Sequence, residues 1–147
     1  LMRHGDYDPF FNNLTDNGCK QVAAIAEEML QSGFIPDVIL ASPVQRTQET
    51  AQIVADVFNR VAGKNVQVIT APALADRETT SESDVRGLLA DHPQAKTFLL
   101  VTHEPNIIIL SKTFNHAIKP EKAEVNIFQL HASSADWVKA FIPAPAA

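Results

Sequence analysis

Residues 1–6 read Leu-Met-Arg-His-Gly-Asp, a short apolar start that runs into Arg3-His4-Gly5. This pattern predicts a strand that presents a cation and an imidazole at its carboxyl end. In open α/β sheets, ligands bind at that edge. Histidine can act as a covalent nucleophile, and arginine matches phosphate oxygens with two hydrogen bonds at once. The stretch therefore suggests phosphoryl chemistry, provided that the chain supplies further phosphate ligands.

Length and composition place the chain among ordinary globular proteins. The 147 residues are 46% hydrophobic and 20% charged, which fits one domain over residues 1–147 with a full core. The net charge of −5 argues against binding to nucleic acid or to a membrane surface, although a local basic pocket can still take an anion. The single cysteine, Cys19, allows no internal disulfide, so we expect a reducing, cytoplasmic setting. No apolar run is long enough to span a membrane.

Apolar runs alternate with amphipathic stretches along the chain. Thr15 is a good cap for a helix that Gly33 closes, and Ser42-Pro43 is typical of a cap followed by proline at the first helical position. The alternation predicts an α/β fold: a three-layer α/β/α sandwich whose mostly parallel sheet has one antiparallel edge. We expect strands near 37–41, 66–69, 97–101, 125–130 and 137–142, and helices after residues 15, 42, 81 and 105.

Three strand-to-helix junctions carry unusual residues: 3–5, 42–46 and 102–105. Each follows a predicted parallel strand, so all three open on the same edge of the sheet. Arg46 lies in the first turn of its helix, where side chains lean toward the helix start and hence toward that edge. The helix that we expect to begin at Pro105 adds free N–H groups. Together with Arg3, His4 and His103, these groups predict a pocket for a dianionic phosphoryl group.

Taken singly, these residues have ordinary interpretations. Arg46 alone is typical of a solvated helix position, Ser42-Pro43 of a simple cap, and His103 of a histidine at a strand end. Their joint occurrence at three equivalent junctions favours the pocket.

Four segments carry a resemblance to a known family: 2–6 (Met-Arg-His-Gly-Asp), 14–18 (Leu-Thr-Asp-Asn-Gly), 42–50 (Ser-Pro-Val-Gln-Arg-Thr-Gln-Glu-Thr) and 101–105 (Val-Thr-His-Glu-Pro). In these the chain resembles the histidine phosphatase (phosphoglycerate mutase-like) superfamily, and within it the phosphohistidine phosphatases of the bacterial SixA type. The resemblance implies that His4 is the nucleophile and that Arg3, Arg46 and His103 hold the phosphoryl oxygens. From the same junctions, we expect Gly5, Ser42 and Glu104 to bind substrate.

The chain departs from the family pattern at two places. SixA-type proteins usually carry an arginine shortly before the Leu-Thr-x-x-Gly segment, where this chain has Asn12 and Asn13. Larger relatives take a carboxylic general acid from the segment after the third strand. Asp76 and Glu78 are our candidates there, and Glu82 and Asp84 also lie in that stretch, although solvated loop carboxylates are the ordinary interpretation. Glu104 is an alternative donor or a helix cap.

The expected reaction is in-line attack by a neutral His4, with Arg3, Arg46 and His103 stabilising the phosphoryl oxygens. We expect no cofactor and no metal, because cationic side chains neutralise the phosphate charge. The expected partner is a phosphorylated protein or a small phosphate ester, and the short chain, which leaves little room for a lid, favours phosphohistidine on a protein. A mutase and a non-catalytic phospho-ligand binding module are the alternatives.

Overall fold

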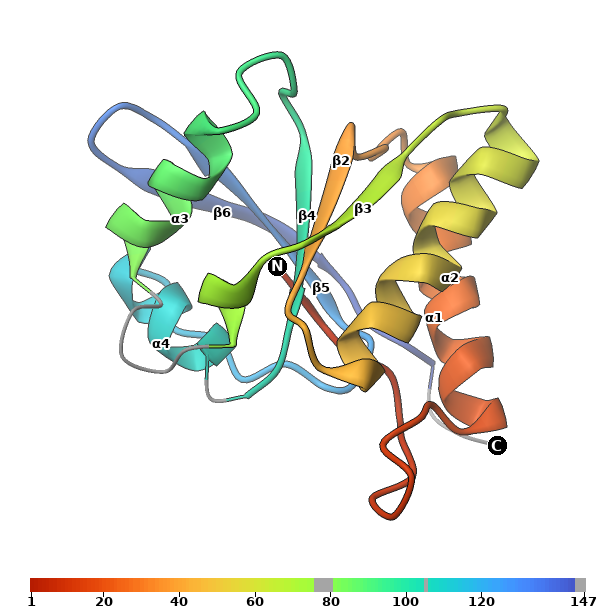
Figure 1. Cartoon of the computed structure of the whole chain (residues 1–147). Coiled ribbons are helices and arrows are strands. Elements are labelled where there is room, and N and C mark those ends of the chain that lie inside the picture. Colours follow the sequence, from red (N-terminus) through yellow and green to blue (C-terminus); the bar gives the residue numbers. More distant parts are fainter. Residues whose placement is uncertain (76–80, 105, 145–147) are drawn as a thin grey trace.

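A six-stranded sheet forms the middle of the molecule in this computed structural model, which describes residues 1–75, 81–104 and 106–144 (Figure 1). The strand order is β3-β2-β4-β1-β5-β6, with β1–β4 mutually parallel and β5 and β6 antiparallel. The antiparallel pair makes the edge that the sequence predicted. The strands are β1 (Met2–Arg3), β2 (Val38–Ala41), β3 (Gln67–Thr70), β4 (Phe98–Thr102), β5 (Val125–Leu130) and β6 (Ala135–Phe141).

Helices cover both faces of the sheet, which confirms the three-layer α/β/α architecture (Figure 1). On one face lie α1 (Asp16–Gln31) and α2 (Gln45–Ala62). On the other lie α3 (Glu82–Ala90), α4 (Asn106–Thr113) and a short 3₁₀ turn at Pro72–Leu74. No helix in the described ranges combines the length and apolar character that a membrane crossing requires.

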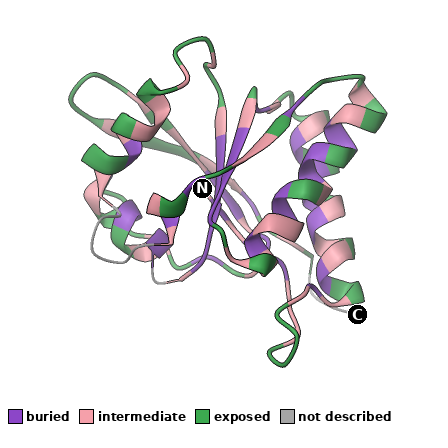
Figure 2. Ribbon diagram, viewed as in Figure 1, coloured by how far each residue is buried: buried purple, intermediate pink, exposed green. Residues whose placement is uncertain are grey.

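The central strands β2 and β4 are mostly apolar and largely buried, because each of their faces packs on a different helix layer (Figure 2). In β2, Ile39 and Ala41 belong to the core under α1 and α2, whereas Leu40 belongs to the core under α3 and α4. The neighbouring β4 repeats this alternation with Leu99 and Leu100. Full burial of such a side chain contributes about 1.5–3 kcal/mol, so the two cores hold the helices firmly against the sheet.

The two predicted helix caps, Thr15 and Ser42, have different outcomes. Thr15 caps α1 as expected, since its hydroxyl oxygen accepts a hydrogen bond from the Gly18 N–H at 2.9 Å. The prediction that Ser42 caps α2 is wrong. The cap residue is Val44, which makes no side-chain cap, and the helix begins at Gln45. The reason is that the Thr47 hydroxyl bonds both the hydroxyl and the carbonyl of Ser42, at 2.6 and 2.9 Å, and folds residues 42–44 into a turn ahead of the helix.

The candidate catalytic junctions meet where the chain leaves neighbouring strands toward opposite faces. From β1 the chain runs to α1 on one face, and from the adjacent β4 it runs to α4 on the other (Figure 1). A crevice at the carboxyl ends of two such strands is the usual ligand site of open α/β sheets. The His4 N–H donates to the Thr102 carbonyl at 3.2 Å, so the pairing of β1 with β4 continues up to the histidine.

Two glycines let the end of β1 approach the start of α1. A Cβ atom at Gly5 would lie 2.8 Å from Val22 Cγ2 and 2.9 Å from the Gly18 carbonyl oxygen. A Cβ atom at Gly18 would lie only 2.1 Å from the Asp6 carbonyl oxygen. The contacts with the two backbone oxygen atoms leave no room for a Cβ atom at either glycine, so a side chain here must push α1 away from the residues that follow His4.

We predict that Gly18→Ala destabilises the protein by about 1–3 kcal/mol, the usual cost of overpacking, and lowers its activity. The matched control is Gly87→Ala in α3, where a Cβ atom meets nothing within 4 Å. That change stabilises the protein by about 0.5–1 kcal/mol, because alanine favours a helix interior over glycine. Urea denaturation of both variants checks the pair, and equal effects of the two substitutions would contradict the packing argument.

Candidate active site

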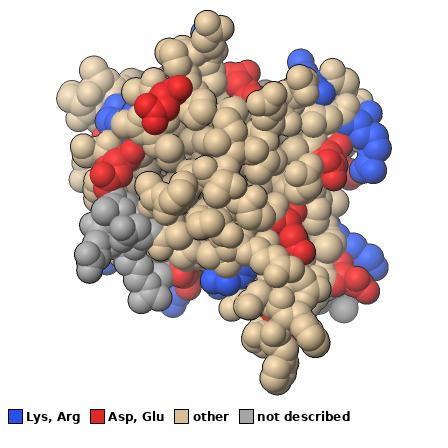
Figure 3. All heavy atoms as spheres, in the orientation of Figure 1, with Lys and Arg blue, Asp and Glu red and all other residues tan. Residues whose placement is uncertain are grey.

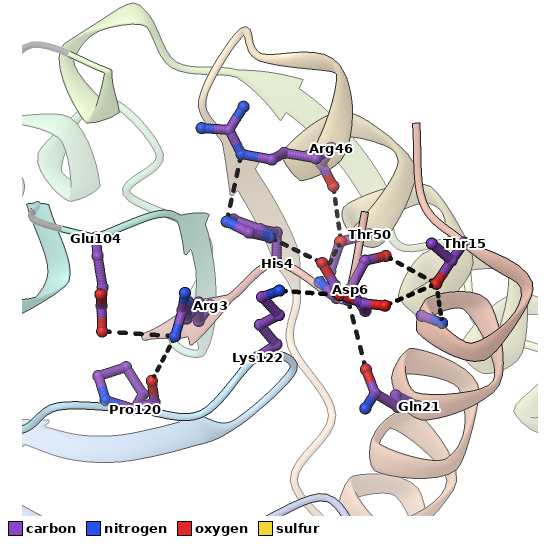
Figure 4. A network of polar contacts seen from close by, with 12 residues as sticks. Arg3, His4, Asp6, Thr15, Gln21, Arg46, Thr50, Glu104, Pro120 and Lys122 are labelled. Carbon is purple, nitrogen blue, oxygen red and sulfur yellow. Dashed lines mark hydrogen bonds and ion pairs between the residues drawn. The ribbon is translucent and has the colours of Figure 1, made fainter. Parts of the chain in front are cut away.

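His4 lies at the end of β1 with one ring nitrogen fixed by the backbone (Figure 4). Its Nδ1 lies 2.8 Å from the Gly5 carbonyl oxygen, which can only accept a hydrogen bond. A neutral His4 must therefore carry its proton on Nδ1, which leaves a lone pair on Nε2. His4 is buried, with 3% of its surface exposed. The neighbouring Tyr7 ring, at 5.1 Å between centroids, contributes to this burial.

Arg46 reaches the free nitrogen of His4. Its Nε–H donates to His4 Nε2 at 3.3 Å, from the first turn of α2, as the leaning of helical side chains predicts (Figure 4). The guanidinium carbon also lies 4.8 Å from the centre of the Tyr7 ring, a cation–π contact of about 0.5–2 kcal/mol. Tyr7 therefore contacts both residues and orients them, although the sequence analysis did not single it out.

The surroundings of His4 keep its imidazole neutral. Burial is the main reason that its pKa falls from 6.5 to about 4. The hydrogen bond to Gly5 opposes this shift, while the positive charges of Arg46, Arg3 and His103 add to it. These charges act on His4 because the residues lie close to it. The structure thus brings together the four residues that the three junctions predicted, while their catalytic roles stay predictions.

Arg3 lies on the side of His4 opposite Arg46, between two hydrogen-bond acceptors (Figure 4). One terminal nitrogen, Nη1, donates to the Pro120 carbonyl at 3.0 Å and lies 3.5 Å from the Glu104 carboxylate. Its Nε is buried and has no hydrogen-bond partner among the described residues. His103 is also buried, 8% exposed, with Nδ1 3.3 Å from the Glu104 carbonyl oxygen. Glu104 therefore lies against Arg3, where it orients the guanidinium.

A second set of contacts joins the end of β1 to its neighbours. The Gly5 N–H donates to the Thr50 hydroxyl at 3.1 Å, and that hydroxyl donates to the Arg46 carbonyl at 2.7 Å. Lys122 forms an ion pair with Asp6 at 2.9 Å, and this contact lowers the pKa of the Asp6 carboxyl. Thr50 lies in a quoted motif, but no local signal could connect Lys122 to a residue 116 positions earlier.

Several predicted site residues lie apart from this cluster. The hydroxyl of Ser42 is fully buried and engaged by Thr47, so its placement favours a structural role. Asp84 completes the cap of α3 with Ser81, and Glu82 pairs with Arg86 within the same helix. The candidate acids Asp76 and Glu78, and the expected helix start at Pro105, lie outside the described residues.

Two hollows help to locate the site. One of about 590 Å³ borders the cluster and is lined in part by Arg3, Asp6 and Lys122. Another of about 710 Å³ lies between the first residues of β4 and strand β5, lined by apolar residues such as Phe98 and Phe128. None of the candidate site residues that the structure describes lines the second hollow, so its size is no guide to the chemistry.

Comparisons with known proteins agree with this geometry. The family description "Histidine phosphatase superfamily (branch 1)" matches residues 1–81, more than half of the chain. The chain therefore belongs to the histidine phosphatase superfamily. This membership supports phosphatase activity. A search of curated protein sequences found no match.

Solved structures share the fold over nearly the whole chain. A candidate phosphohistidine phosphatase SixA from Agrobacterium tumefaciens is similar with a TM-score of 0.73 at 15% identity, covering 97% of this chain and 95% of that chain. The protein histidine phosphatase SixA complexed with tungstate gives 0.72 at 20% identity, with 97% and 94% covered. Phosphoserine phosphatase from Entamoeba histolytica, in complex with 3-phosphoglyceric acid, gives 0.59 at 18% identity, with 95% and 94% covered. They confirm the phosphoglycerate mutase-like fold that the resemblance implied.

The low pKa of His4 predicts a pH-dependent loss of stability. The unfolded chain binds a proton at this histidine below pH 6.5, whereas the folded protein does so only near pH 4. Stability therefore falls as the pH drops below 6.5, by about 2 kcal/mol at pH 5 from this residue alone. Urea denaturation at pH 7.5 and pH 5, in phosphate-free buffer, should show this loss for the wild type relative to His4→Asn. Parallel losses in the two proteins would mean that His4 titrates normally.

Proposed function

We propose that this protein is a phosphatase that removes a phosphoryl group from histidine, or from another phosphorylated side chain, on a protein. The observation that carries the proposal is the state of His4. Its Nδ1 is engaged by the Gly5 carbonyl, while its Nε2 lone pair accepts a hydrogen bond from the Arg46 Nε–H and becomes available to phosphorus when Arg46 turns to the phosphoryl oxygens. A neutral imidazole so oriented, with cations around it, suits covalent phosphoryl transfer.

The reaction proceeds in two displacements. The His4 Nε2 lone pair forms a bond to phosphorus while the bond from phosphorus to the leaving group breaks in line. Arg3, Arg46 and His103 stabilise the equatorial oxygens. Water then attacks the phosphorus of phospho-His4, the N–P bond breaks, and phosphate leaves. Gly5 positions the imidazole through its carbonyl, and Asp76 or Glu78 is our candidate for the acid that protonates a poor leaving group.

The choice of a protein substrate rests on chain length and leaving-group chemistry. The chain shares its fold with two SixA structures over 97% of its residues, and the described ranges hold no additional element large enough to act as a lid. A phosphohistidine leaves as an imidazole and needs less help from a strong acid than an alkoxide does. The single cysteine supports a reducing compartment, and we propose the cytoplasm.

A small phosphate ester is the second candidate substrate. The similar fold of a phosphoserine phosphatase that holds 3-phosphoglyceric acid favours this alternative. A mutase must exclude water to retain its phosphoryl group, which the short chain disfavours. A non-catalytic binding module needs no nucleophile at His4.

We predict that His4→Asn abolishes hydrolysis of p-nitrophenyl phosphate and that Arg46→Lys lowers kcat about 10²–10³-fold. Lysine keeps the charge, but it cannot repeat the guanidinium contacts with the phosphoryl oxygens. The matched control is Arg60→Lys on an exposed position near the end of the same helix, which should leave kcat unchanged. Acid-quench labelling with a ³²P substrate should trap phosphoenzyme in the wild type and not in His4→Asn. Retained turnover in His4→Asn would contradict the covalent mechanism.

We predict that activity withstands EDTA and prefers a phosphorylated protein to 3-phosphoglycerate. The cations Arg3, Arg46 and His103 supply the charge that would otherwise be asked of a metal. The assay gives EDTA-treated enzyme a histidine-phosphotransfer domain phosphorylated with phosphoramidate, beside 3-phosphoglycerate. Loss of activity in EDTA that Mg²⁺ restores would contradict metal-independent catalysis. A higher kcat/KM for 3-phosphoglycerate would contradict the preference for a phosphorylated protein.

A further inference from the structure

A loop that projects beside the candidate site ends in two bare aromatic rings. Phe10 is 90% exposed and Phe11 is 74% exposed. In Figure 1 this loop is the red segment between β1 and α1 that extends away from the body, and Figure 3 shows the same projection without Lys or Arg atoms at its tip. A large exposed apolar group on a soluble protein is informative, because such groups commonly mark interaction sites.

The loop has a defined conformation. The Asp8 N–H donates to the Asn13 carbonyl at 2.8 Å, and the Asn12 N–H donates to the Asp8 carbonyl at 2.7 Å. The Asp8 carboxylate accepts from the Phe10 N–H at 2.8 Å. Asn12 adopts a left-handed conformation, with φ of 60°, that asparagine tolerates better than most residues. The backbone therefore turns so that the two rings point outward, and folding holds them there.

The base of the loop is built into the candidate site. Tyr7 and Leu14 form an antiparallel bridge that closes the loop. The Leu14 N–H donates to the Glu49 carboxylate on α2 at 2.7 Å, and Tyr7 packs against His4 and Arg46. These contacts fix the base of the loop directly beside His4 and Arg46.

Distance and energy point to a partner that covers the site and the loop together. Phe10 follows His4 by six residues, so their Cα atoms are at most about 22 Å apart even for an extended chain. A typical interface covers about 800 Å² on each protein, a patch wide enough to include both. Burial of the two rings against a partner would remove from water an apolar surface that the free protein leaves exposed.

Charge indicates what kind of partner this is. Residues 5–14 contain no lysine, arginine or histidine, and their two carboxylates are Asp6, which pairs with Lys122, and Asp8. Nucleic acid and anionic lipid surfaces attract basic residues, so both are disfavoured here. A folded protein with an apolar patch, neutral or basic at its border, is complementary to this loop.

We infer that Phe10 and Phe11 form a docking element that binds an apolar patch beside the phosphorylated residue of a folded protein substrate. This inference rests on the proposed function and adds to it the surface that selects the substrate. Small phosphate esters reach only the pocket and do not contact the two rings. The loop therefore affects KM for phosphoproteins and not the chemistry at His4.

The test compares Phe10→Ser/Phe11→Ser with Val61→Ser, which removes another exposed apolar side chain at the far end of α2. The probes are p-nitrophenyl phosphate and a phosphoramidate-treated histidine-phosphotransfer domain. The double variant should raise KM for the phosphorylated domain about tenfold or more, a usual effect for interface aromatic residues, and leave p-nitrophenyl phosphate turnover unchanged. Val61→Ser should change neither.

Other outcomes overturn the inference in distinguishable ways. Unchanged KM for the phosphorylated domain in the double variant rules out docking through these rings, as does an equal loss on both substrates. Failure of the wild type to act on the phosphorylated domain, with p-nitrophenyl phosphate still hydrolysed, removes the docking role and leaves a small-molecule phosphatase. If the wild type cosediments with phosphatidylcholine vesicles and the double variant does not, the rings bind a membrane instead. If light scattering shows a dimer for the wild type and a monomer for the double variant, the rings bind a second copy of the chain.

Discussion

The hydrogen bond from His4 Nδ1 to the carbonyl of the next residue is the constraint on which the candidate site depends. It selects one tautomer, and it turns the other nitrogen toward Arg46. The bond exists because the chain at Gly5 is held from two sides, by the Thr50 hydroxyl and by the close approach of α1 at Gly18. Local backbone packing thus sets the proton position on the imidazole, which then decides what chemistry the ring can do.

The second feature of the site is a neutral ring among cations. Arg3 and Arg46 carry positive charge next to the His4 imidazole. Burial and these charges together keep the pKa of that imidazole low. Before a phosphoryl group arrives, Arg3 is held by Glu104 and the Pro120 carbonyl. Preorganised donors of this kind need little rearrangement when negative charge develops on a ligand, which is the most effective use of electrostatics in catalysis.

Sequence patterns predicted the layers and the three junctions because both depend on local rules. Apolar runs such as 38–41 need cover on both faces, and Arg46 must lean toward the start of its helix. The patterns could not predict contacts made by tertiary packing. Ser42 carries a cap signal, yet Thr47 takes its hydroxyl. Lys122 reaches Asp6 from the other end of the chain, and the burial of His4 depends partly on how Tyr7 folds back over it. The candidate acids Asp76 and Glu78 lie in a segment whose sequence has no periodic pattern, so their role stays a prediction.

The pairing of β1 has a consequence for how the molecule is assembled. Met2 pairs with Val101 on one side and with Val125 on the other, so the strand that carries His4 finds its neighbours only among residues made about a hundred positions later. Such non-local pairing is slow to form. During synthesis, β1 must wait for β4 and β5, and a chain that stops before β5 leaves one edge of β1 without its partner strand. The surroundings of His4 are therefore complete only after β5 has been made and paired.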